Sequence, residues 1–152
     1  MMSVQPRGPL SGYRILELAT TLSGPIGAML LADQGADVIK LESPGGDQLR
    51  NAGGSRKGVA GLATMFLNAN RNKRSIVADL KSDEGRDTAR ALAAASDVVI
   101  QNFRPGVVER LGLSYDDLRK LRPDLIYVSI DGVGEVGPDR NRRVYDLSLI
   151  HI

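Results

Sequence analysis

The chain has 152 residues, 42% of them hydrophobic, which is enough for one domain with a core of its own. Its 20 Lys and Arg against 18 Asp and Glu leave a net charge of +2, and its four Tyr and two Phe lie apart from the basic clusters, so the composition argues against a nucleic-acid-binding protein. With no cysteine and one histidine, disulfides and a cysteine nucleophile are excluded, and we expect neither a metal site nor a Ser/His/Asp triad.

The first residues contain Pro and Gly where a secretory signal needs an apolar core. No apolar run approaches the ~20 residues that span a bilayer. We therefore expect a cytoplasmic protein that does not bind membranes.

The predicted elements begin at residues 13–18, a strand candidate with the sequence YRILEL. Residues 24–34 predict a helix that ends before Gly35, and residues 37–42 (DVIKLE) predict a second strand. A Gly-rich connection of about 25 residues follows, with a short helix predicted at 61–67. A connection of this length is typical of a functional loop.

The second half continues the alternation with a third strand at residues 75–80. A helix at 82–96 begins with Ser82 as its cap and with acidic residues in its first turn. Residues 97–100 predict the fourth strand, residues 114–120 a capped helix, and residues 125–130 the fifth strand. Strands that alternate with helices indicate an α/β fold with a Rossmann-like parallel sheet and flanking helices.

This architecture predicts where a ligand binds. In open parallel sheets the crevice lies beyond the carboxyl ends of the strands, near helix N-termini that favour anions. Three segments leave the predicted sheet there, at residues 19–27, 101–106 and 131–143. The last two carry Arg, so an anionic or phosphorylated ligand is expected.

A dinucleotide is one candidate ligand. A strand, a glycine turn, a helix and a second strand that ends in an acid, Glu42, follow the order of NAD-binding proteins. However, SGPIGA supplies only G-x-x-G, and Pro25 is also a common first residue of a helix. An NAD-dependent oxidoreductase therefore stays an alternative.

Five motifs, taken together, resemble one family. In order they are GYRILEL, SGPIGAMLLADQGADVIKLESPGGD, NRNKRSIVADLKSDEG, DVVIQNFRPGVVERLGLSYDDLR and RPDLIYVSIDGVGEVGP. This series, over residues 9–146, resembles the N-terminal part of class III CoA-transferases, the CaiB/BaiF family. The resemblance implies a truncated part of a larger two-domain chain, with residues 1–146 belonging to the large, CoA-binding domain.

The resemblance implies that the family's substrates are an acyl-CoA and a carboxylic acid, between which coenzyme A moves, and that the intact protein is an interlocked homodimer. Lys73 is expected at the phosphate end of CoA with Arg74 beside it, and Leu22 and Ser23 near the thioester. The residues implied to bind CoA are Leu22, Ser23, Lys73, Arg74, Asn102, Phe103, Arg104, Arg110, Leu111 and Arg143. Where some relatives have an Arg that contacts CoA after the second strand, this chain has Ser43.

One geometric conflict accompanies these expectations. If all strands are parallel, Lys73 precedes its strand and lies at the opposite edge of the sheet from Asn102. The connection at residues 44–70, or an extended CoA across the sheet, then has to bridge the two edges.

The catalytic group of the family is an Asp that attacks the acyl-CoA thioester, and the resemblance places it about thirty residues beyond Tyr145 and Asp146. The expectation is therefore that this chain carries no catalytic residue. Residues 147–152 (LSLIHI) translate CTGTCTCTTATACACATC, a transposon end used in preparing sequencing libraries, and are expected to be a non-native tail.

Two further alternatives stay open. The racemase branch of the family has a His where this chain has Tyr145, and a phenol with an ordinary pKa near 10 exchanges protons poorly at neutral pH. The other alternative is a non-catalytic nucleotide-binding α/β module.

Overall fold

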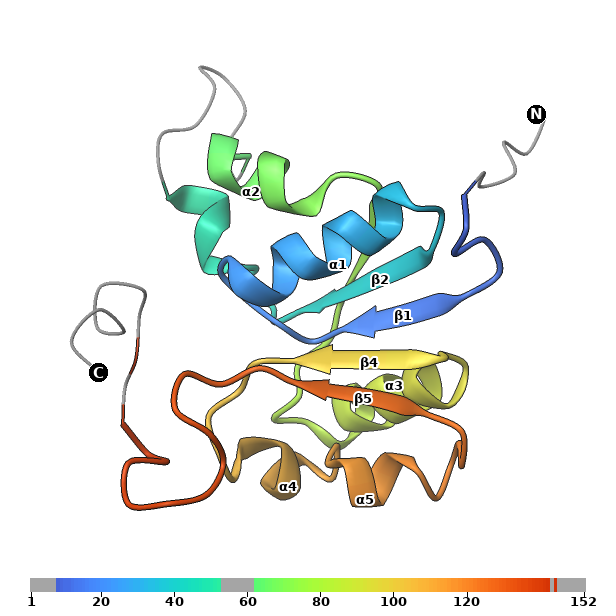
Figure 1. The fold of residues 1–152 in the computed structure, drawn as a ribbon. Coiled ribbons are helices and arrows are strands. Elements are labelled where there is room, and N and C mark those ends of the chain that lie inside the picture. Colours follow the sequence, from blue (N-terminus) through green and yellow to red (C-terminus); the bar gives the residue numbers. More distant parts are fainter. Residues whose placement is uncertain (1–7, 53–61, 143, 145–152) are drawn as a thin grey trace.

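A five-stranded parallel sheet organises the chain in the computed structural model, which describes residues 8–52, 62–142 and 144 (Figure 1). The strand order is β3-β2-β1-β4-β5, and all four pairings are parallel. The strands are β1 (Arg14–Glu17), β2 (Asp37–Glu42), β3 (Lys73–Val77), β4 (Val98–Gln101) and β5 (Ile126–Ser129). This confirms the predicted Rossmann-like α/β class.

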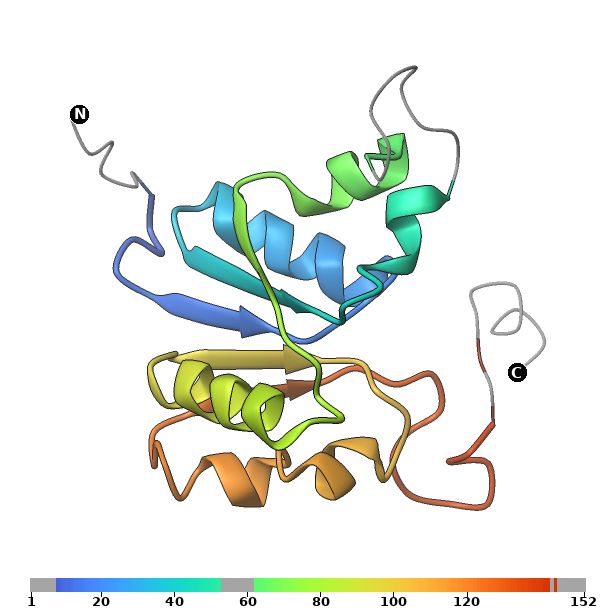
Figure 2. The same cartoon turned by 180° about the vertical axis from the view of Figure 1, so that it is seen from behind.

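Helices cover both faces of the sheet. One face carries α1 (Ser23–Asp33), α2 (Thr64–Asn70) and the 3-10 helix η1 (Gln48–Asn51). The other face carries α3 (Asp83–Ala94), α4 (Val107–Leu111) and α5 (Tyr115–Leu118), as the view from behind shows (Figure 2). The chain changes faces between β3 and β4, so the strand order reverses between β1 and β4, where doubly wound folds bind their ligands.

The core consists of two apolar layers, one on each face, because neighbouring strand residues point to opposite sides. Ile15 and Val38 pack under α1, whereas Leu16, Leu41 and Val99 pack on the opposite side of the sheet. The last half of β2 departs from this pattern, since its Lys40 and Glu42 are also buried.

Helix capping follows the sequence closely. The Ser82 side chain accepts a hydrogen bond from the Gly85 amide at the start of α3, and Ser114 caps α5 in the same way. β3 begins at Lys73, two residues before the predicted strand. The sequence pattern does not predict α4, because five residues are too few to show a helical period.

Several expectations fall outside the described residues: Arg143, Tyr145, Asp146 and the tail at 147–152. Within the part that the structure describes, no helix has both the length and the apolar composition needed to cross a bilayer.

Candidate functional site

Two turns meet at the carboxyl edge of the sheet, the one after β1 and the one after β4. The Asn102 side chain joins them, since its Oδ1 accepts from the Thr20 amide at 2.9 Å and its Nδ2 donates to the Thr20 carbonyl at 2.8 Å. Residues 82 positions apart are thereby held together by a two-point contact. The structure thus brings the predicted Leu22–Ser23 segment next to the predicted Asn102–Arg104 segment.

The turn after β1 has an unusual backbone. Thr21 has a φ of 68°, in the left-handed region that β-branched residues rarely adopt. Gly24 lies directly against Ala19, and a Cβ at position 24 would be 2.3 Å from the Ala19 Cβ. Leu22 is half-buried and Ser23 is exposed at the start of α1.

A chain of hydrogen bonds anchors the turn after β4. The Phe103 amide donates to Gln101 Oε1 at 2.7 Å, Gln101 Nε2 donates to Ser129 Oγ at 2.7 Å, and Ser129 Oγ donates to Glu135 Oε1 at 2.5 Å. Gln101 is only 2% exposed, so the chain of bonds runs from the interior to the surface. Beside it lies a cavity of about 270 Å³ whose lining includes Arg104, Gly106, Glu109, Ser129, Glu135 and Arg140.

Two of the predicted cations lie on this edge and are available to a ligand. Arg104 and Arg110 are exposed, and neither guanidinium has a hydrogen-bond or ion-pair partner within the described ranges. Arg110 lies close to Gly106, where a Cβ would be 3.2 Å from Arg110 Nη1. Phe103 and Leu111 are partly buried against the core, so they support this edge of the sheet and offer a ligand little exposed surface.

Lys73 lies elsewhere than expected. Its side chain is 2% exposed and its Nζ is 2.6 Å from Glu17 Oε2. The same ammonium group donates to the Pro25 carbonyl and to Asn70 Oδ1, both at 2.8 Å. Burial lowers the pKa of Lys73, and the Glu17 carboxylate opposes this shift. In this arrangement the Lys73 ammonium group faces the interior. A direct contact with a CoA phosphate therefore has to come from a cation other than Lys73.

Arg74 lies at the amino edge of the sheet, where Nη2 is 2.6 Å from Asp37 Oδ2 and the side chain is 61% exposed. Arg74 therefore lies at the opposite edge from Asn102, because Asp37 opens β2 and Asn102 follows β4. The conflict is expected for Lys73, which also begins β3 at this edge, but its ammonium group reaches Glu17, the last residue of β1. A wider hollow of about 820 Å³ lies at this amino edge. Its Arg14, Asp37, Asp97 and Arg122 side chains pair with charges of the same chain, so none of the described residues that line it offers a free cation to an anion.

Glu42 is the acid that ends the second strand, as in NAD-binding proteins, but its carboxylate is occupied by hydrogen bonds from neighbouring groups. Its side chain is 2% exposed and accepts from Arg50 Nε and Nη2, both at 2.6 Å, and from Ser75 Oγ at 2.7 Å. Burial favours a higher pKa, but these bonds and the Asp47 amide outweigh it and lower the pKa of Glu42 to about 2. The carboxylate is therefore not free to bind a ribose, which weighs against the oxidoreductase alternative.

Lys81 is a further exposed cation that the sequence analysis does not single out. Because β3 ends at Val77, Lys81 follows it on the same edge as Asn102, and the residue is exposed. Its amide donates to Asp79 Oδ1 at 3.0 Å, which shapes the turn before α3. The signal in the sequence is the D-L-K that follows the strand, at the edge where the fold predicts a ligand. In the described part of the chain, no group of three His, Cys, Asp or Glu side chains is arranged to hold a metal ion.

Comparison with known proteins gives a consistent result. The family model for CoA-transferase family III matches residues 10–151. The chain is 48% identical over 143 residues to the succinate–glutarate CoA-transferase of Agrobacterium fabrum, covering 91% of this chain and 36% of that protein. It is 41% identical over 143 residues to the acetyl-CoA:oxalate CoA-transferase of Acetobacter aceti, covering 93% of this chain and 36% of that protein.

Solved structures agree with the sequence comparison. The crystal structure of a CaiB/BaiF family protein from Brucella suis superposes with a TM-score of 0.88 at 45% identity, covering 93% of this chain and 38% of that one. The chain therefore spans rather more than a third of the length of the relatives it matches.

Proposed function

Because the chain belongs to CoA-transferase family III, we propose that it forms the CoA-binding part of an enzyme that transfers coenzyme A between carboxylic acids. The observation that carries this proposal is the joined pair of turns at the carboxyl edge, where Asn102 holds Thr20. Arg104 and Arg110 stand beside this contact without partners in the described residues.

The chemistry of CoA fits this edge of the sheet. Its ADP end carries a 3′-phosphate and a pyrophosphate, which need cations and amide donors. Arg104, Arg110 and Lys81 supply exposed cations on the required edge. A hydrogen bond to a charged group contributes roughly 1.5–3 kcal/mol, so two such contacts account for a large part of a micromolar affinity.

We place the other end of CoA near the turn after β1. Ser23 is exposed and Leu22 half-buried there, so the turn offers both a polar and an apolar contact to the pantetheine arm. Transfer then requires a carboxylate that attacks the thioester carbonyl, breaks the C–S bond and releases the CoA thiolate, leaving an acyl anhydride on the enzyme. We assign this nucleophile to the Asp expected beyond Asp146 and assign no catalytic residue to the described residues.

The acceptor is proposed to be a carboxylic acid, since the relatives above are named for succinate, glutarate and oxalate. Residues 1–146 are proposed to belong to the large domain of a longer cytoplasmic protein that forms an interlocked homodimer. The transferase is preferred to the racemase branch because both named enzymes above are CoA-transferases.

Titration calorimetry on the 152-residue chain tests this proposal with CoA, dephospho-CoA and NAD. We expect CoA to bind, NAD to give no heat, and dephospho-CoA to bind about tenfold more weakly if a cation contacts the 3′-phosphate. Arg104→Ala and Arg110→Ala should each weaken CoA binding by about tenfold or more. Arg119→Ala is the matched control, because Arg119 is also exposed but lies at the C-terminal end of α5, next to Asp116.

The ligand comparison locates each contact. A substitution that weakens CoA but leaves dephospho-CoA unchanged identifies the cation at the 3′-phosphate, whereas one that weakens both identifies a cation at the pyrophosphate. A folded chain that binds none of the three ligands would contradict the proposal. A chain that binds NAD more tightly than CoA would support the oxidoreductase alternative instead.

A further inference from the structure

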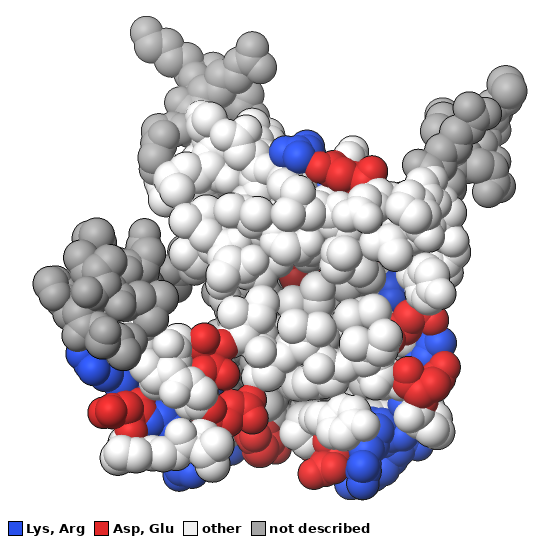
Figure 3. All heavy atoms as spheres, in the orientation of Figure 1, with Lys and Arg blue, Asp and Glu red and all other residues white. Residues whose placement is uncertain are grey.

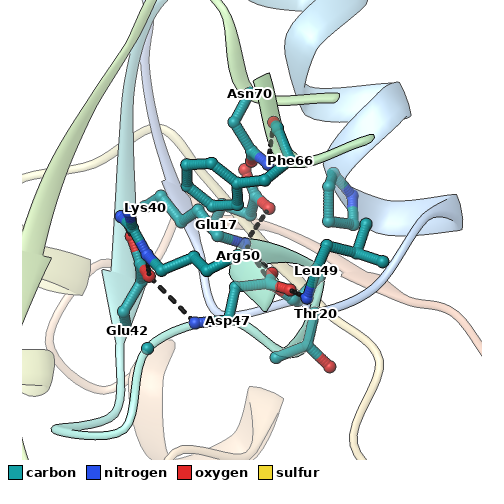
Figure 4. Close-up of polar contacts among 12 residues, drawn as sticks. Glu17, Thr20, Lys40, Glu42, Asp47, Leu49, Arg50, Phe66 and Asn70 are labelled. Carbon is teal, nitrogen blue, oxygen red and sulfur yellow. Dashed lines mark hydrogen bonds and ion pairs between the residues drawn. The ribbon is translucent and has the colours of Figure 1, made fainter. Parts of the chain in front are cut away.

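A cluster of four buried charges lies between the sheet and the helices α1 and α2. Lys40 Nζ is 3.0 Å from Glu17 Oε1 and 2.9 Å from Asp47 Oδ2, and Lys73 Nζ is 2.6 Å from Glu17 Oε2. No side chain of this cluster is more than 2% exposed. Its charges sum to zero, and Glu17, Lys40 and Asp47 can be followed in Figure 4.

The two ammonium groups also reach the backbone of the turn after β1. Lys40 donates to the Ala19 carbonyl and Lys73 donates to the Pro25 carbonyl, each at 2.8 Å. Cations from β2 and β3 thus hold the first residue of the turn and the first turn of α1, into which the turn leads. Side chains on two neighbouring strands fix both ends of the segment 19–25.

The conformation of this turn needs such support. Thr21 is held in the left-handed region, and a β-branched residue leaves that region when its surroundings allow. Asn102 holds only the neighbouring Thr20. Besides this contact, the carbonyls at residues 19 and 25 are two points where side chains of β2 and β3 fix the segment to the sheet.

Stability alone does not account for the four charges. Buried ion pairs are often no more stabilising than apolar side chains of similar volume, because desolvation of both ions offsets their attraction. An apolar side chain, however, cannot donate a hydrogen bond to the carbonyls of Ala19 and Pro25. The two ammonium groups supply this hold on the turn, and apolar replacements would not.

We propose that Lys40 and Lys73 are positioning residues, which keep the segment of residues 19–25, the β1–α1 turn with the first residues of α1, in its strained, binding-competent shape and so set the affinity for the thioester arm of CoA. This role rests on the proposed function of the site. It assigns Lys73 an indirect contribution to CoA binding through the Pro25 carbonyl, in place of a direct phosphate contact.

The test is a charge-balanced double substitution, Glu17→Met/Lys73→Met, which removes one negative and one positive charge and leaves Lys40 with Asp47 and the Ala19 carbonyl. Hydrogen exchange followed by NMR reports on the turn without any ligand. We expect the Thr20 and Ile26 amides, which bond to Asn102 and Leu22, to exchange at least tenfold faster. Amides of β1 and β2 should keep their rates.

The matched control is Asp33→Asn/Arg71→Gln. It removes an exposed ion pair that links the end of α1 to the residue after α2, at the other edge of the sheet. The exchange rates of the turn should not change in this control. CoA affinity, measured separately, should fall at least fivefold in Glu17→Met/Lys73→Met and stay constant in the control.

Each outcome decides one question. Faster exchange confined to the turn supports the positioning role even if the parent chain binds no CoA, in which case only the proposed function fails. Unchanged exchange of the turn in a folded variant overturns the inference. If the variant does not fold, Lys40→Met/Asp47→Asn removes the other half of the cluster. Failure of both variants to fold, or a uniform acceleration over the whole sheet, means that the cluster is a core stabiliser and overturns the inference.

Discussion

The charged side chains at this site fall into two groups, those whose charge already has a partner in the chain and those whose charge has none among the described residues. Glu42 and Lys73 are buried and fully engaged with neighbours, whereas Arg104 and Arg110 are exposed and have no partner within the described ranges. A cation that already faces a carboxylate gains little from a phosphate, since both anions compete for the same donors. The free arginines are therefore the residues for which we expect direct contact with the ligand.

The pH dependence of stability should reflect Glu42. Its pKa is about 2 in the folded chain, below the ordinary value of 4.5, so the unfolded chain binds the proton first as the pH falls. The stabilisation is present above pH 4.5 and is lost progressively between about pH 5 and pH 2. We expect Glu42→Gln to lower the free energy of unfolding at pH 7 by on the order of 2 kcal/mol and to flatten its decline in this range.

Urea unfolding at a series of pH values measures this effect. Asp87→Asn serves as the control, because Asp87 is 74% exposed and its pair with Arg90 lies on the helix surface. The control should change stability by less than about 0.5 kcal/mol. An equal pH profile for Glu42→Gln and the parent chain would contradict the assignment.

At the scale of elements, the site depends on contacts between turns that belong to different βα units. The β1–α1 turn touches the turn after β4 only because these two strands are neighbours in the sheet. The strand order reverses between them, which leaves room above their carboxyl ends for a ligand. The turn after β3 approaches the same edge, and α3 begins so close to it that a Cβ on Gly85 would lie 2.0 Å from the Asp79 carbonyl oxygen.

Asn102→Ala should separate the two turns. The substitution removes both hydrogen bonds to Thr20, and we expect a loss of about 1 kcal/mol in stability and about a tenfold weaker affinity for CoA. Calorimetry and urea unfolding measure the two effects on the same preparation. Asn68→Ala, an exposed asparagine on α2, is the control. Unaltered CoA affinity in a folded Asn102→Ala chain would show that the contact does not organise the site.

For the whole molecule, the outer surface of α1 is informative. Apolar residues lie all round this helix, including the exposed Ile26 (41%) and Leu30 (50%). Met65 and Leu67 of α2, the helix that packs against α1, are also exposed. In the space-filling view the surface over α1 is almost free of charge, whereas charged side chains gather around α5 and the loop after β5 (Figure 3). A helix that is apolar on every side is typical of one covered on every side.

We therefore predict that the chain self-associates through this surface. Sedimentation velocity at rising concentration should show larger species, and Leu30→Glu should shift the distribution toward monomer without lowering the melting temperature by more than a few degrees. Leu121→Glu, which alters an exposed apolar residue after α5, is the control and should not change the distribution. A parent chain that stays monomeric at about 0.1 mM would contradict this prediction.

The sequence by itself determined the class of fold and most of the elements. The alternation of strands and helices, the Ser82 and Ser114 caps and the strand at residues 37–42 are local properties, set by side-chain period and by backbone hydrogen bonding at helix ends. Short elements such as α4 escaped prediction because they carry too few residues for a period to show.

Only the tertiary structure decided which cations face the ligand. Strand periodicity places Lys73 on one side of the sheet. It does not show that α1 and α2 cover that side, or that Glu17 is buried there within ion-pair distance of Lys73. In the same way, no local pattern joins Thr20 to Asn102 across 82 residues. Such contacts depend on the order in which strands pair, which follows from the packing of the whole chain and from no single segment of it.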